Sequence, residues 1–201
     1  MRKTIPASID EIYLSSSVTV GQYRIWESQK NTAEIAEFIR RRFNERFLAP
    51  FETIPSSLRS GFAQMAVCCL MIETLESFYK GWKSTSGVKG SDVFEGFFTR
   101  VRYFHDFQGL GGEFYTNIRC GILHQAETTS GWLVRRRGNL VDKSNKIINA
   151  DKFIKFLGQS LDDYCQELQS TRWNDLRWRK CRRKMNGVIE HCEKSTTGAL
   201  K

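Results

Sequence analysis

The stretch GFAQMAVCCLMIETLESFYK, residues 61–80, decides the fold because its middle is apolar on every side of a helix. Such a helix is buried on more than one side, so we predict a central helix over about 57–80 that Gly81 ends. The apolar run itself, residues 61–72, stops at Glu73 and is shorter than the roughly 20 residues of a membrane span. We therefore expect no membrane helix.

Further helices are predicted on both sides of this one from apolar residues at helical spacing. Each candidate helix begins at a residue suited to a helix N-terminus. The predicted ranges are 31–48 with Asn31 as cap, 91–106 with Ser91 as cap, 113–124 with Glu113 at its start, and a helix from Asp151 as cap to about residue 170.

Between the fourth and fifth of these helices the pattern changes to short strand-like runs. GWLVRRRG (131–138) and KIINA (146–150) flank the turn-rich NLVDKSN (139–145), which predicts a β-hairpin. The predicted fold is thus mostly α, a helical bundle with a small β-hairpin. We expect an unassigned N-terminal segment over 1–30, a helical domain over 31–170 and a basic, helical tail over 171–201.

Charge favours a polyanionic partner. The chain of 201 residues carries 31 basic and 22 acidic residues, a net charge of +9. The tail 171–201 holds nine of the basic and three of the acidic residues, so it supplies most of the excess. Nucleic acids attract such segments through their phosphates, which makes RNA a candidate partner.

Cysteine usage and the N-terminus both indicate the cytoplasm. The six cysteines show no C-x-x-C pair, which favours reduced thiols over disulfides, and the N-terminus has no apolar signal core. Cysteine and histidine spacing matches no usual zinc site, so we expect no metal and no cofactor. A zinc-stabilised binding domain stays as a third possibility, drawing on Cys120, His124, Cys181, His191 and Cys192.

The stretch FYTNIRCGILHQAET, residues 114–128, holds the candidate catalytic pair, Arg119 and His124. Five residues along an α-helix turn the chain by about 500°, so the two side chains do not share one face. Two copies of the helix crossing about a twofold axis would bring Arg119 of one chain towards His124 of the other. Gly121 lies between them, and we expect it to allow close approach of the partner helix.

Arg119 and His124, late in a helix that follows GG-E-F-Y and a long helix reading IETLESFYKG, resemble the Arg-x4-6-His motif of the HEPN family. The layout resembles that family across about residues 31–170. The resemblance implies a dimeric, metal-independent ribonuclease in which His124 is the acid/base residue and Arg119 binds phosphate. Members commonly carry a polar residue after the arginine, where this chain has Cys120. Some toxin members have a modified tyrosine at the position of Ala126, so that regulation is not expected here.

The implied reaction needs only these side chains and RNA. An imidazole near its ordinary pKa of about 6.5 accepts or donates protons at neutral pH, and the forked guanidinium binds phosphate oxygens. Attack of the ribose 2′-hydroxyl would leave a 2′,3′-cyclic phosphate. Glu73, in the apolar stretch, would need a cation or hydrogen-bond donors if buried, and Arg119 is a candidate partner. If the helix turns that face outward, Glu73 would instead be exposed to solvent.

Basic and aromatic side chains elsewhere are candidate RNA contacts. Three arginines follow His124 on the predicted hairpin, and the tail interleaves tryptophan with arginine, a mixture suited to stacking on bases and pairing with phosphates. The candidates are Arg135, Arg136, Arg137, Trp173, Arg177, Trp178 and Arg179. The tail could equally dock on the domain through its own apolar stripe.

Two classes of function therefore stay open. The leading hypothesis is a homodimeric endoribonuclease, with a regulatory protein partner possible. The alternative is a non-catalytic HEPN-like dimerisation module that binds RNA or a protein, with Cys120 marking a decayed site. Arg119 and His124 would then be structural residues at a helix end, with His124 helping to cap the helix.

Overall fold

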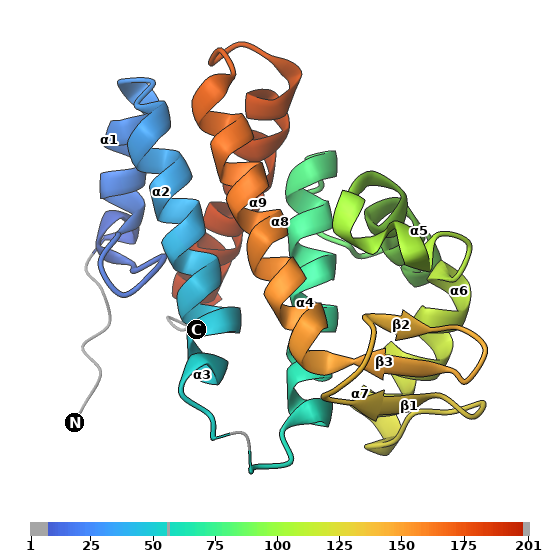
Figure 1. Cartoon of the computed structure of the whole chain (residues 1–201). Helices are drawn as coiled ribbons and strands as arrows, with labels where there is room; N and C mark the ends of the chain where they lie inside the picture. The colour runs from blue at the N-terminus through green and yellow to red at the C-terminus, as the bar shows by residue number, and fades with distance from the viewer. Residues whose placement is uncertain (1–7, 56, 199–201) are drawn as a thin grey trace. The chain divides into compact units, whose positions relative to one another are not determined.

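The computed structural model describes residues 8–55 and 57–198, with side chains to residue 194, and it is mostly helical with one small sheet (Figure 1). The mostly α prediction is confirmed. The chain divides into two compact units, the first of residues 1–45, 77–84 and 163–201 and the second of residues 46–76 and 85–162. This division differs from the linear one that we predicted, because the N-terminal segment and the tail belong to one unit.

The first unit is built from η1 (Ile9–Glu11), α1 (Val20–Ser28), α2 (Thr32–Phe43), α9 (Leu176–Gly198) and the C-terminal ends of α4 and α8. Its core is aromatic. Tyr23 contacts Phe38 with ring centroids 5.9 Å apart, and Tyr79 contacts Tyr164 at 4.9 Å. The predicted tail helix is therefore observed, and its apolar side is buried through Cys181 and Met185.

The second unit holds most of α4 (Gly61–Lys80) and α8 (Ala150–Ser170) and all of the chain between these two helices except residues 81–84. Phenylalanines dominate its core, and seven of them are buried: Phe94, Phe97, Phe98, Phe104, Phe107, Phe114 and Phe153. The helices that carry them are α5 (Gly90–Arg100), η3 (Arg102–Phe107), α6 (Gly111–Phe114) and α8. A π-helical segment, η2 (Asn44–Leu48), and α3 (Ala49–Glu52) precede α4.

Helix starts were predicted with mixed success. The Asn31 side chain accepts a hydrogen bond from the Glu34 backbone N at 3.3 Å, which confirms that cap. Ser91 is not a cap, because α5 begins one residue earlier with Lys89 in the cap position. Nor is Asp151: the Asn149 side chain accepts from the Lys152 backbone N at 3.1 Å, ahead of α8.

The sheet corrects the predicted hairpin. Its strands are β1 (Leu133–Arg135), β2 (Val141–Asp142) and β3 (Ile147–Asn149), in the spatial order β1-β3-β2 (Figure 1). β1 runs parallel to β3, whereas β2 runs antiparallel to it. The hairpin is thus formed by β2 and β3, and the two runs that we paired as hairpin arms lie parallel.

The physical reason lies at Asp142. Its carboxylate accepts hydrogen bonds from the Asn145 backbone N at 3.0 Å and from the Asn145 side-chain amide at 2.8 Å. Aspartate side chains that bind the backbone a few residues on are typical of tight turns. The turn therefore begins at Asp142, inside the stretch that we read as loop, and Val141 is free to pair with Ile148.

α4 is long and apolar enough to cross a membrane by length and composition, and it is the one such helix among the described residues. More than half of its apolar window is buried inside the protein, and it carries Glu73 and Glu76. Those two properties are expected of the buried core helix that the sequence predicted.

Candidate functional site

The candidate catalytic residues lie in one helical segment, residues 111–125 of the second unit. It consists of α6, the π-helical turn η4 (Tyr115–Cys120) and α7 (Gly121–Gln125). The Glu95 carboxylate caps its start, accepting hydrogen bonds at 2.8 Å from the backbone N of Gly109 and from that of Gly111. π-Helical turns are rare in proteins, and those that occur are often found at functional sites. This one carries Arg119.

Arg119 is fixed by an ion pair with the central helix. Its Nε donates to Glu73 Oε1 at 2.9 Å, and its guanidinium carbon lies 5.6 Å from the Tyr115 ring centroid. The side chains of Arg119 and Glu73 are about four-fifths buried, with 21% and 19% exposed. Of the alternatives that the sequence left open for Glu73, the structure shows the ion pair with Arg119.

Electrostatics in this cluster follow from the ion pair. Partial burial acts to lower the pKa of Arg119, but the hydrogen bond and the charge of Glu73 outweigh it and raise that pKa. A hydrogen bond with Cys120 raises the pKa of Tyr115. Burial, followed by the Glu73 charge, raises the pKa of the Cys69 thiol. The surroundings of Arg119 thus favour its cationic form.

His124 lies on α7 with an exposed side chain. Within the part of the chain that the structure describes, its imidazole makes no hydrogen bond or ion pair. The segment ends instead through Ala126, whose left-handed backbone (φ 57°) turns the chain back, so that the Glu127 backbone N donates to Gly121 O at 3.4 Å. The structural alternative in which His124 caps the helix is therefore wrong.

The same turn corrects our explanation of Gly121. A Cβ atom at this position would lie 2.5 Å from the carbonyl oxygen of Glu127, well inside van der Waals contact. The chain's own backbone therefore requires glycine here. Gly121 gives no support to a close-packed partner helix, which stays a prediction that rests on the geometry of Arg119 and His124 alone.

The three arginines that follow this segment divide between two environments. Arg136 is held in the second unit, with Nε 2.8 Å from Asp151 Oδ1 and an Nη1 hydrogen bond of 2.8 Å to the Leu58 carbonyl. Arg135 and Arg137 are exposed and make no ion pair with a described residue. Arg135 is the last residue of β1, whereas Arg136 and Arg137 lie in the bend that follows the strand. Of these three arginines, Arg135 and Arg137 are the ones open to solvent.

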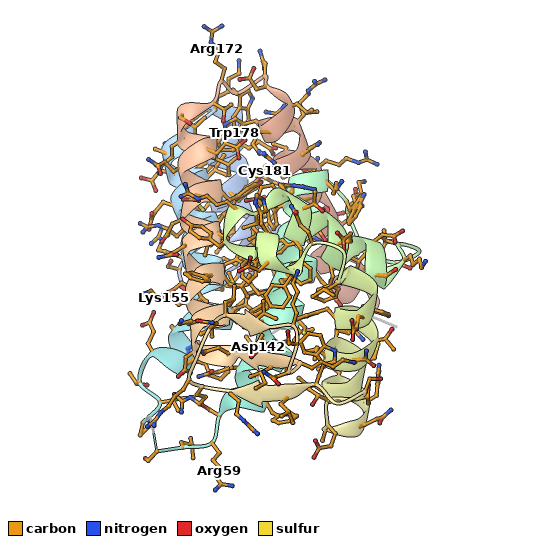
Figure 2. All side chains as sticks on the ribbon, turned by 45° about the vertical axis from the view of Figure 1, so that its right-hand side comes forward. Arg59, Asp142, Lys155, Arg172, Trp178 and Cys181 are labelled. Carbon is orange, nitrogen blue, oxygen red and sulfur yellow. The ribbon has the colours of Figure 1, made fainter. Side chains whose placement is uncertain are left out.

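The tail residues also divide. Trp178 is fully buried, and its indole N–H donates to the Leu168 carbonyl at 2.9 Å, so the prediction that it stacks on bases is wrong. In Figure 2 the side chain of Arg172, by contrast, projects outward. The tail's apolar stripe docks on its own unit, and docking removes this ring from solvent.

Arg177 has a structural role beside Trp178. Its guanidinium pairs with Glu167 at 2.7 Å and lies over the Tyr79 ring, 4.8 Å from the centroid. Trp173 stays half-buried, with Arg182 4.3 Å from its ring centroid. Arg179 is exposed and makes no ion pair with a described residue. Of the four predicted tail contacts, Arg179 is therefore the accessible cation.

Sequence reasoning missed Glu95 and Tyr115 as members of this site. The only signal for Glu95 was the glycine pair at 111–112, where free backbone N–H groups at a helix start call for an acceptor. No group of three or more histidine, cysteine and acidic side chains in the described part of the chain could hold a metal ion. None of the six cysteines, all of which the structure describes, forms a disulfide.

Comparison with known proteins found no match to this chain. No family model matches it, and neither does any curated protein or solved structure.

Proposed function

We propose that the protein is a metal-independent endoribonuclease of the HEPN type, with a composite site built from Arg119 and His124 of two chains. The hold on Arg119 carries the proposal. Only the Nε of Arg119 donates a hydrogen bond to Glu73. The N–H groups of both Nη atoms make no hydrogen bond to a described residue, so they are available to a ligand. A fixed, partly exposed guanidinium fork is suited to two oxygens of one phosphate.

The chemistry divides between the two side chains. His124 takes the proton from the ribose 2′-hydroxyl, O2′ attacks phosphorus, and the bond from phosphorus to O5′ breaks as His124 returns that proton to O5′. The products are a 2′,3′-cyclic phosphate and a 5′-hydroxyl end. Arg119 binds the phosphate and the charge that grows on its oxygens in the transition state. DNA lacks the attacking hydroxyl and should stay intact.

The positions of the two side chains support the proposed dimer. Arg119 is mostly buried against Glu73, whereas the imidazole of His124 is exposed and not bonded to it. A second chain packed about a twofold axis would place its own His124 over the exposed side of Arg119. The site would then need both copies, and the free chain would be poorly active.

Single substitutions test the two roles. RNA is incubated with the protein in excess EDTA, and we expect Arg119→Lys and His124→Ala each to lower the cleavage rate at least about 100-fold. The matched controls are Arg100→Lys, whose arginine pairs with Glu76 on the same central helix at 2.9 Å, and His105→Ala, another exposed histidine. Cleavage that survives both site substitutions would end the proposal.

Mixing the inactive chains tests the composite site. A dimer of one Arg119→Ala chain and one His124→Ala chain has one intact site of two, so an equal mixture should regain about a quarter of the wild-type rate. If each site were instead formed within a single chain, the mixture would regain no activity. The rate of the mixture therefore separates the two arrangements directly.

A non-catalytic binding module is the second candidate. The observation that favours it is the imidazole of His124, for which no described residue supplies the hydrogen bond that usually orients a catalytic base. Wild-type protein that binds RNA but yields no cyclic phosphate would establish this function in place of the first.

A further inference from the structure

A cavity of about 420 Å³ lies in the second unit, and neither Arg119 nor His124 is among its lining residues. Its apolar walls include Phe51, Ile54 and Ile154, and its polar lining includes Gln64 and Lys155. Cavities of this size hold small ligands, and this one combines apolar walls with polar groups that could orient a ligand. Its polar groups identify the ligand's chemistry.

Gln64 points to a missing hydrogen-bond donor. Its side chain is buried, with 3% exposed, and its Nε2 donates to Ser60 Oγ at 3.3 Å. Its Oε1 is buried and accepts no hydrogen bond from any described residue. A buried carbonyl oxygen left unpaired costs about 1–3 kcal/mol, so such groups usually have a partner. A ligand with an N–H group would supply it.

The charged groups around the cavity differ in how they are engaged. Arg136 and Asp151 neutralise each other at 2.8 Å. Lys155 is exposed, projects away from α8 in Figure 2, and makes no ion pair with a described residue. Glu52 is likewise an exposed acceptor without such a pair. Among the described residues, Lys155 and Glu52 are therefore the cation and the carboxylate of this lining that have no ion-pair partner.

We propose that this cavity binds one unpaired nucleoside of an RNA strand, an inference that rests on the ribonuclease function proposed above. The apolar walls contact the faces of the base, and Gln64 Oε1 accepts from an N–H of its edge. Glu52 accepts from ribose hydroxyls, and Lys155 binds the phosphate. A site of this kind would hold the strand by one base without using any catalytic residue.

Binding of mononucleosides and their 5′-monophosphates, measured by calorimetry, tests the cavity. The protein carries His124→Ala, so that cleavage plays no part. Gly158→Leu fills the cavity from α8, and Gln64→Leu removes the acceptor; each should weaken binding about tenfold or more. Gln159→Leu, one residue from Gly158 and outside the lining, should leave binding unchanged. Circular dichroism checks that each variant folds.

Lys155→Gln adds a readout of orientation. It should weaken binding of the monophosphates about threefold or more while leaving the nucleosides unaffected, because only the phosphate contacts the ammonium group. Inorganic phosphate alone should not compete with a nucleoside. Competition by phosphate, or equal losses for nucleosides and monophosphates, would overturn the assignment of the base to the cavity.

The two proposals fail separately. Suppose that the wild-type protein cleaves RNA but binds no nucleoside at millimolar concentration, or that Gly158→Leu does not weaken nucleoside binding. Either result would overturn the cavity proposal alone. Nucleoside binding that depends on Gln64 and Gly158, in a protein that cuts no RNA, would overturn the ribonuclease alone.

Discussion

Two helical glycines of the second unit differ in what a methyl group would meet. At Gly121 a Cβ would lie 2.5 Å from the Glu127 carbonyl oxygen, whereas at Gly158 it would lie 3.6 Å from Leu48 Cδ1, an ordinary contact. We expect Gly121→Ala to lower the free energy of unfolding by about 1–3 kcal/mol and Gly158→Ala to raise it by about 0.5–1 kcal/mol. Urea denaturation measures both.

Equal effects of the two substitutions would contradict this. Helix propensity alone favours alanine at both positions, so it predicts two gains. The opposite signs therefore depend on the close approach of the backbone at Glu127.

The partner of an individual side chain was predictable where a buried charge requires one. A carboxylate at position 73 in an apolar helix needs a cation, and the ion pair with Arg119 is observed. Gly121 was misassigned because the contact that requires it depends on a left-handed Ala126, and alanine gives no sequence signal for that backbone conformation. Trp178 was misassigned because a tryptophan among arginines fits both stacking on RNA and docking on the protein.

Glu95 links one element to another, and its loss should act on the helical segment 111–125. Glu95→Ala removes the acceptor of the Gly109 and Gly111 backbone N–H groups, so we expect the free energy of unfolding to fall by about 1–2 kcal/mol. Hydrogen exchange should show faster exchange of those two amides in particular.

Asp92→Ala is the control on the same helix. Asp92 is exposed and accepts a hydrogen bond from Ser91 Oγ, its neighbour, so its loss should change stability by less than about 0.5 kcal/mol. Unchanged exchange at Gly109 and Gly111 in Glu95→Ala would show that the carboxylate does not cap this segment.

At the scale of elements, periodicity found the long helices and missed the sheet order. The central helix, predicted over 57–80 and ended by Gly81, is observed as Gly61–Lys80. Strands of two or three residues carry too little pattern to fix their partners. The parallel pairing of β1 with β3 depends on a turn that a single side chain, Asp142, sets.

For the molecule as a whole, the proposed RNA partner predicts a salt-dependent contribution from the tail. Arg179 and Arg183 lie one turn apart on α9, both are exposed, and neither pairs with a described acidic residue. Replacing both with glutamine should weaken binding of single-stranded RNA and reduce the slope of log affinity against log salt by about 1.4. Filter binding across a salt series measures this slope.

Arg177→Gln is the matched control, because Arg177 is engaged by Glu167 and Tyr79. It should lower stability and leave the salt slope unchanged. An unchanged slope in the double variant would place the RNA contacts elsewhere.

The domain layout was the least predictable property at this scale. Composition marked residues 171–201 as a separate basic tail, yet they share a compact unit with residues 1–45. The joining contacts are between residues far apart in sequence, such as Arg24 with Glu193 at 3.2 Å. A single sequence carries no sign of such pairs, because exposed charges occur everywhere along it.

The π-helical turn at 115–120 has a consequence for how the segment is aimed. It accommodates more residues in a turn than an α-helix does, so the phase of α7 relative to α6 differs from that of an unbroken helix. α6 is anchored by the buried Phe114, and α7 bears the exposed imidazole. The number of residues in that turn, and not only the identity of the side chains, therefore sets the direction in which His124 faces the solvent.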